Sequence, residues 1–148
     1  MSGRTLAEPL AAAGITLVLL FLGAGLLALG TAESALDAFF RSGPASVVGI
    51  LGVAVLLWIV LLLVAAAVNR SRSPVVRLVT DTLLTLLVGG AALAFWAAFA
   101  AAVGGFGDLV VGIAVVDVAL FCGAALIALV LTHLVLFRRT PPAPAAVA

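Results

Sequence analysis

Four long apolar runs, separated by short polar segments, organise the chain. They cover residues 10–30, 46–68, 75–103 and 109–137. A helix needs about 20 apolar residues to cross the ~30 Å hydrocarbon core of a bilayer, and each run reaches that length. The links after the second and third runs are short, which favours antiparallel neighbours. The pattern therefore predicts an all-α membrane protein, a four-transmembrane-helix up-down bundle.

The first run has a competing interpretation as a secretory signal peptide. Residues 30–32, Gly-Thr-Ala, resemble a small-residue cleavage site. The apolar region of a signal peptide is about 7–15 residues long, however, and this run is longer. We therefore expect a retained first span.

The segment between the first two runs carries charges at helical spacing. Glu33, Asp37 and Arg41 follow one another at intervals of four, and Phe39 and Phe40 lie away from that face. A charged stripe opposite bulky apolar residues is typical of a helix lying in the membrane interface. We expect a short amphipathic interfacial helix here.

The arginines predict the orientation of the spans. With four spans, six arginines lie on one side of the membrane and Arg41 lies on the other. The six are Arg4, Arg70, Arg72, Arg77, Arg138 and Arg139. Positive residues concentrate on the cytoplasmic side, so we predict a multi-pass cell-membrane protein with both termini in the cytoplasm. Residues 1–9 would form a cytoplasmic N-terminus, 10–139 the single transmembrane domain, and 140–148 a disordered Pro/Ala-rich tail.

Small residues recur every four positions in the third run. Gly90, Ala94, Ala98 and Ala102 would share one helix face. Helices in lipid associate through close packing, which small residues permit. This spacing predicts a close helix contact at these four positions.

Composition narrows the possible functions. The chain is 66% hydrophobic and 9% charged, with a formal net charge of +1, whereas a nucleic-acid partner requires a strongly basic surface. Its single cysteine, Cys122, cannot form an internal disulfide or a cysteine metal site. We expect no nucleic-acid partner, no metal and no cofactor.

Two aspartates lie within the apolar runs. Asp117 is a carboxylate inside the fourth run, where such a group is costly and faces protein or water. It is either a proton or cation site, an anchor for a partner, or a packing carboxylate hydrogen-bonded within the bundle. Asp81 follows Arg77 by four residues near the start of the third span, which predicts an interfacial ion pair rather than a transport role.

The remaining chemistry is sparse. His133 lies about one turn before the cytoplasmic end of the fourth span and does not share the helix face of Asp117, so we interpret it as an interfacial histidine. No nucleophile, base and acid combine into a catalytic pattern, and we expect no enzymatic activity and no catalytic residue.

Two functions fit four apolar spans that carry so few polar residues. The first is a structural or accessory subunit of a larger membrane assembly, whose partners are membrane lipids and other integral membrane proteins or further copies of itself. The alternative is a small oligomeric transporter or channel that uses Asp117. Fold alone does not choose between them.

Overall fold

The structure, a computed structural model, describes residues 4–31, 43–103 and 107–138. Within these ranges the chain forms four helices: α1 (Arg4–Thr31), α3 (Gly43–Val68), α4 (Pro74–Val103) and α5 (Gly107–Arg138). Each is long and apolar enough to cross a membrane, which confirms the prediction of an all-helical protein with four candidate spans. The predicted interfacial helix with Glu33, Asp37 and Arg41 lies outside the described residues.

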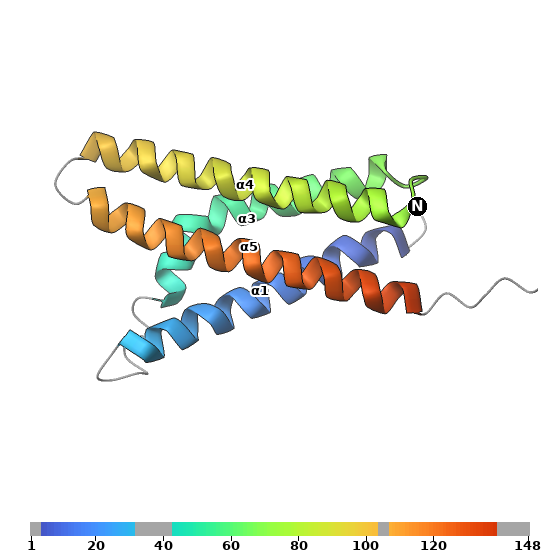
Figure 1. Ribbon diagram of the computed structural model, residues 1–148, viewed down its shortest axis with the longest axis horizontal. Helices are drawn as coiled ribbons and strands as arrows, with labels where there is room; N and C mark the ends of the chain where they lie inside the picture. The colour runs from blue at the N-terminus through green and yellow to red at the C-terminus, as the bar shows by residue number, and fades with distance from the viewer. Residues whose placement is uncertain (1–3, 32–42, 104–106, 139–148) are drawn as a thin grey trace, which may run out of the picture.

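The helices run alternately in opposite directions, and α5 is the central one (Figure 1). It packs against α4, α1 and α3. In the α5 span 44% of the residues are buried, against 22% in the α4 span. Helix α3 crosses the bundle from the end of α1 to the beginning of α4. The beginnings of α1 and α4 and the ends of α3 and α5 meet at one end of the bundle, which we call the loop end because residues 69–73 join α3 to α4 there.

The start of α4 is specified locally. Ser73 precedes the helix, and its side-chain oxygen accepts a hydrogen bond from the backbone N–H of Val76 at 3.4 Å. Pro74 occupies the first helical position, where its missing N–H leaves no bond unmade. This Ser-Pro pair places Arg77 in the first turn, on the side of the neighbouring α3 terminus.

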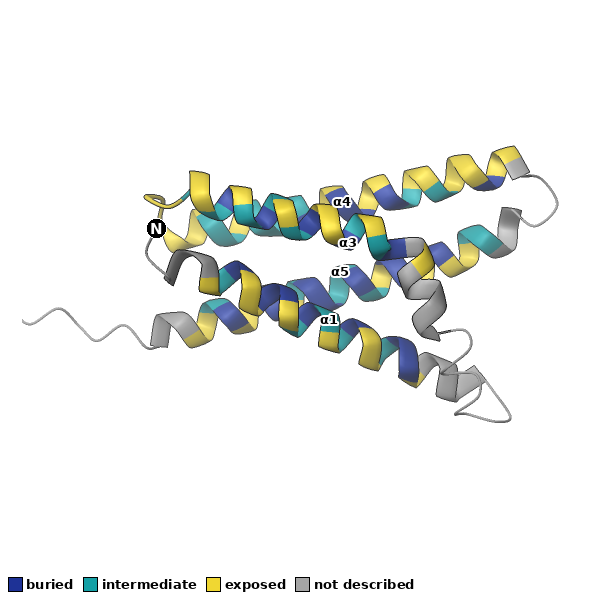
Figure 2. Cartoon of the chain, turned by 180° about the vertical axis from the view of Figure 1, so that it is seen from behind, coloured by how far each residue is buried: buried dark blue, intermediate teal, exposed yellow. Residues whose placement is uncertain are grey.

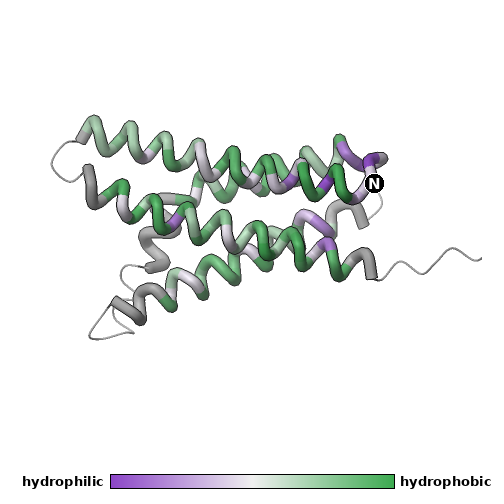
Figure 3. Tube along the Cα trace, in the orientation of Figure 1, coloured by the Kyte–Doolittle hydropathy of each residue, from purple (hydrophilic) through white to green (hydrophobic). Residues whose placement is uncertain are grey.

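Burial alternates with exposure along all four helices (Figure 2). The outward positions carry large apolar side chains such as Val53, Leu26 and Val68, which are 81%, 68% and 73% exposed. Figure 3 shows that most hydrophilic segments of the described helices lie near the loop end, with one on α5 away from it, and that the described helices are otherwise mainly apolar. An apolar exterior of this kind is suited to lipid rather than to water.

The centre of the bundle is built on Trp58, which is fully buried on α3. Its indole N–H donates a hydrogen bond to the Thr85 hydroxyl of α4 at 2.9 Å. Its ring meets Phe121 of α5 edge to face, with the centroids 5.4 Å apart. One side chain thus joins three helices, by a hydrogen bond and by an aromatic contact.

Buried threonines satisfy their hydroxyl groups within their own helices. Thr16, Thr85 and Thr132 each donate a hydrogen bond to the carbonyl four residues earlier, at 2.7–2.8 Å. The Thr85 oxygen can therefore accept from Trp58 while its hydrogen is used on α4. In a span surrounded by lipid, this arrangement leaves no hydroxyl hydrogen of these three residues without an acceptor.

The close approach of α4 to α5 occurs at Gly89, which is buried. A Cβ atom at this position would lie 2.5 Å from the Cys122 sulfur and 3.4 Å from Val118 Cγ1. The neighbouring Gly90 is exposed, and a Cβ there would meet nothing within 4 Å. A side chain at 89 would therefore force Cys122 to move, whereas one at 90 would not displace a neighbour.

This finding corrects the contact predicted from the four-residue spacing. Gly90, Ala94, Ala98 and Ala102 are all exposed and do not form the seam within this chain. The contact with the bundle is made on an adjacent face of α4, which includes Val88, Gly89 and Ala92. Periodicity identified a row of small residues, but the rotation of α4 about its axis depends on what α3 and α5 present to it.

We expect Gly89→Ala to lower the free energy of unfolding by about 1 kcal/mol, because the added methyl group overpacks the α4–α5 seam. Gly90→Ala is the matched control and should be neutral or slightly stabilising, since alanine favours helix. Removing the obstructing sulfur with Cys122→Ala should restore part of the loss in the double variant. Detergent-denaturation curves measure all three. Equal effects at 89 and 90 would contradict this assignment of the seam.

Candidate functional site

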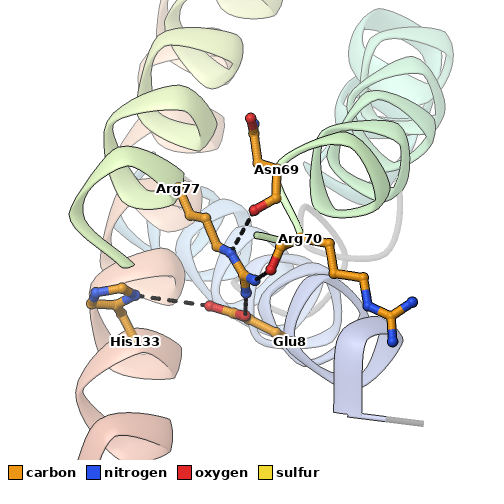
Figure 4. A network of polar contacts seen from close by, with 5 residues as sticks. All are labelled: Glu8, Asn69, Arg70, Arg77 and His133. Carbon is orange, nitrogen blue, oxygen red and sulfur yellow. Dashed lines mark hydrogen bonds and ion pairs between the residues drawn. The ribbon is translucent and has the colours of Figure 1, made fainter. Parts of the chain in front are cut away.

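Polar side chains from three helices and backbone carbonyl groups from the loop after α3 meet at the loop end (Figure 4). Glu8 comes from α1, Arg77 from α4 and His133 from α5. Asn69 and Arg70 follow the last residue of α3. We call these five residues the loop-end cluster.

Arg77 is the most connected member of the cluster. Its Nε donates to the carbonyl oxygen of Asn69 at 3.0 Å, and its Nη2 donates to the carbonyl oxygen of Arg70. Its Nη1 lies 3.4 Å from Glu8 Oε2 as a hydrogen bond and ion pair. The last carbonyls of a helix have no donor within the helix and attract positive charge. The guanidinium therefore closes the end of α3 and binds α1 at the same time.

Glu8 connects to a second helix through its other oxygen. Oε1 lies 3.8 Å from Nδ1 of His133 on α5, which is within ion-pair range when the imidazole is protonated. The side chains of Glu8 and His133 are 27% and 16% exposed. Glu8 therefore lies between Arg77 of α4 and His133 of α5.

A small cavity lies beside this cluster, with a volume of about 20 Å³. That is enough for one water molecule. Its polar lining comes from Glu8, Asn69, Arg77, Asp81, Thr132 and His133, and its apolar lining includes Ala12, Leu62 and Leu129. A water here would have several polar partners, so the cavity is suited to hydration rather than to a larger ligand.

The predicted pairing of Arg77 with Asp81 is corrected by this geometry. Among the described residues the structure shows no ion pair between these two side chains; Arg77 is directed to Glu8 and to the end of α3. Asp81 lies one turn further along α4 and lines the cavity. Spacing of four residues brings two side chains to one face, but tertiary partners compete for the guanidinium.

Asp117 belongs to a different part of the molecule. It is 5% exposed on the buried face of α5, together with Val118 and Phe121. Sixteen residues separate it from His133, which corresponds to roughly 24 Å along the helix. It lines neither the loop-end cavity nor the grooves described next, so the structure does not bring it together with Asp81.

Two larger hollows on the outside of the bundle are apolar. One, of about 580 Å³, lies between α1 and α5 and is lined by Leu19 and residues of the 115–127 region. The other, of about 380 Å³, lies between α1 and α3 around Phe21 and Gly52. Both are open grooves with apolar linings, so they are suited to contact with the hydrocarbon chains of a membrane.

Metal binding finds no support in the described residues, where no three His, Cys, Asp or Glu side chains are arranged to hold an ion. Glu8, Asp81 and His133 share the cavity, yet the guanidinium of Arg77 occupies the space beside them. The arrangement has room for a water molecule, and it links helices.

Sequence reasoning missed Glu8 and Asn69 as site residues and treated His133 as isolated. The sequence did contain a hint that these residues lie near one another, because four alternating spans place residues 8, 69–81 and 133 on the same side of the membrane. The sequence did not show how far each helix is rotated about its own axis, and therefore which of these residues face one another. Residue 8 was also assigned to a polar N-terminus, whereas α1 begins at Arg4 and includes it.

Comparisons with family models, curated proteins and solved structures find no match to this chain. The function must therefore be argued from the geometry alone.

We expect Arg77→Lys to lower the free energy of unfolding by about 1–2 kcal/mol, because an ammonium group cannot reproduce the three-directional contacts of a guanidinium. Arg72→Lys, in the same loop, changes an exposed side chain and leaves the backbone unaltered; it is the matched control and should have no measurable effect. Denaturation in detergent micelles measures both variants. Equal stability of the two would show that the contacts of Arg77 contribute nothing specific.

Proposed function

We propose that this protein is a small polytopic membrane protein that acts as a structural or accessory subunit of a larger membrane assembly. The observation that carries this proposal is the outward face of α4. Gly90, Ala94, Ala98 and Ala102 form an exposed ridge of small residues there. The chain itself uses a different face of α4 for its own packing, around Gly89.

The surroundings of the ridge support the same proposal. Phe95 and Phe99 are 63% and 44% exposed, and each ring contacts Trp96 edge to face at 5.5 and 5.3 Å. Small residues let another helix approach closely, and neighbouring aromatic rings supply a large contact area. A partner helix would bury both. The partner is another integral membrane protein or a second copy of this chain, with membrane lipids covering the remaining surface.

The internal polar contacts are consistent with a scaffold. Trp58 and Thr85 join α3 to α4, and Glu8 joins α1 to α4 and α5. These groups hold the chain's own helices together and are not directed to a ligand-sized cavity. We further propose that the loop end is cytoplasmic, because the arginines of the 69–77 region lie there.

A second candidate function is a small oligomeric transporter or channel that uses Asp117. The observation that favours it is the burial of this carboxylate, 5% exposed, within a helix of the membrane-spanning type. Such residues often mark ion pathways. Against it, neither the loop-end cavity nor the two apolar grooves reach Asp117, so the single chain offers no polar route to it through them.

We expect Ala98→Leu to abolish association in native membranes, because the larger side chain prevents close approach of a partner helix to the ridge. Ala67→Leu, the same change at an exposed position on α3, is the matched control. Affinity purification in mild detergent, followed by mass measurement of the intact complex, compares the two with the unaltered chain. Identical complexes from all three would rule out the ridge as the contact surface.

We expect no proton flux above the background of protein-free vesicles when the purified chain is reconstituted with a pH-sensitive dye inside. Asp117→Asn should then behave like the unaltered chain. Flux that is present in the unaltered chain and lost in Asp117→Asn would replace the accessory-subunit proposal with the transporter.

A further inference from the structure

The loop that joins α3 to α4 carries two exposed arginines at the depth where a membrane has its lipid headgroups. The apolar span of α3 ends at Val68 and that of α4 begins at Pro74, so residues 69–73 lie between two span ends. Arg70 and Arg72 are both exposed in this loop. In a bilayer, the layer just beyond the hydrocarbon contains the charged groups of the lipids.

Hydrogen bonds hold the backbone of this loop in place. The N–H of Arg72 donates to the carbonyl oxygen of Asn69 at 3.0 Å and closes a turn. Arg70 and Ser71 form the corner of that turn. The guanidinium of Arg77 donates to the carbonyl oxygens of Asn69 and Arg70. The loop is therefore shaped before any ligand binds, which reduces the entropy that binding would cost.

The charges of these two arginines are not neutralised by the described part of the chain. Arg70 belongs to the loop-end cluster through its carbonyl oxygen, and its side chain extends away from Glu8 (Figure 4). Glu8 is engaged by Arg77 and His133. Within the described residues, no ion pair includes Arg70 or Arg72. The loop therefore presents two guanidinium groups to its surroundings.

Apolar side chains border the two arginines on both helices. Val64 and Val68 at the end of α3 are 52% and 73% exposed. Val75 and Val79 at the start of α4 are 67% and 52% exposed. Residues four apart lie on one helix face, so each pair forms an apolar strip that runs from the loop into the span. A ligand with an anionic head and hydrocarbon chains matches both the arginines and the strips.

We propose that the 69–73 loop and the two valine strips bind an anionic phospholipid. The guanidinium groups of Arg70 and Arg72 receive the headgroup phosphate, and the acyl chains lie along the strips. A guanidinium presents paired N–H donors to two phosphate oxygens and is more weakly hydrated than an ammonium group. This inference requires the four spans to lie in a bilayer, but it does not depend on the accessory-subunit role proposed above.

Native mass spectrometry of the full chain in a non-ionic detergent tests this site. The probes are phosphatidylglycerol and phosphatidylcholine with the same acyl chains, since the choline cation cancels the headgroup charge. A basic residue near anionic lipid contributes a factor of about five in affinity, so two arginines should favour phosphatidylglycerol by about 25-fold. Arg70→Gln and Arg72→Gln should each lower this preference about five-fold, and the double variant should bind both lipids equally.

Arg41→Gln is the matched control, because it removes one arginine from the segment that joins the opposite ends of α1 and α3. It should leave the preference for phosphatidylglycerol unchanged. Inorganic phosphate and glycerophosphoglycerol, which has no acyl chains, separate the lipid from its headgroup. Neither should displace phosphatidylglycerol at equal concentration, because neither can use the valine strips.

Four results would overturn the lipid site. Equal affinity of the unaltered chain for the two lipids is the first, and it requires no variant to fold. An equal loss of preference in Arg41→Gln would show a general effect of net charge. Displacement of the lipid by inorganic phosphate or glycerophosphoglycerol would assign the loop to a soluble anion. Tighter binding of a polyglutamate peptide than of phosphatidylglycerol would assign it to an acidic protein partner.

Discussion

Hydrocarbon offers no hydrogen-bond partner, and this constraint accounts for the placement of several polar groups of the four spans. Threonine hydroxyls donate to carbonyls of their own helices. The indole N–H of Trp58 finds the Thr85 oxygen on the next helix. The carbonyl oxygens of Asn69 and Arg70, which follow α3, accept hydrogen bonds from the guanidinium of Arg77. The apolar contacts of the bundle are arranged around these few obligatory bonds.

The same constraint makes the two ends of the bundle unequal. At the loop end, Glu8 connects α1 to α4 and α5, and Arg77 adds α3, so all four helices meet in one polar network. Away from that end, α3 turns toward α1, and the outer half of α4 is mostly exposed. A face that the chain leaves uncovered is available to another helix, whereas Glu8 and Arg77 at the loop end are already committed to internal contacts.

Local rules predicted some of these features and not others. The lengths of the apolar runs predicted four helices, because crossing a bilayer sets a minimum length independent of neighbours. The structure shows no ion pair between Arg77 and Asp81, because the guanidinium contacts Glu8, 69 residues away in the sequence, and the carbonyl groups of Asn69 and Arg70 in the adjoining loop. The small-residue row of α4 was identified correctly as a pattern, but it lies one residue away from the internal seam at Gly89.

The sequence by itself determined the helical class, the approximate spans and the concentration of arginines at one end. These depend on composition along a single helix and on the thickness of a membrane. Only the tertiary structure decided that Glu8 and His133 belong to one site, that Gly89 rather than Gly90 is enclosed, and that Asp117 is separate from Asp81. Those outcomes depend on how far each helix is rotated about its own axis. That rotation is set by the simultaneous fit of all four helices, and no single helix encodes it.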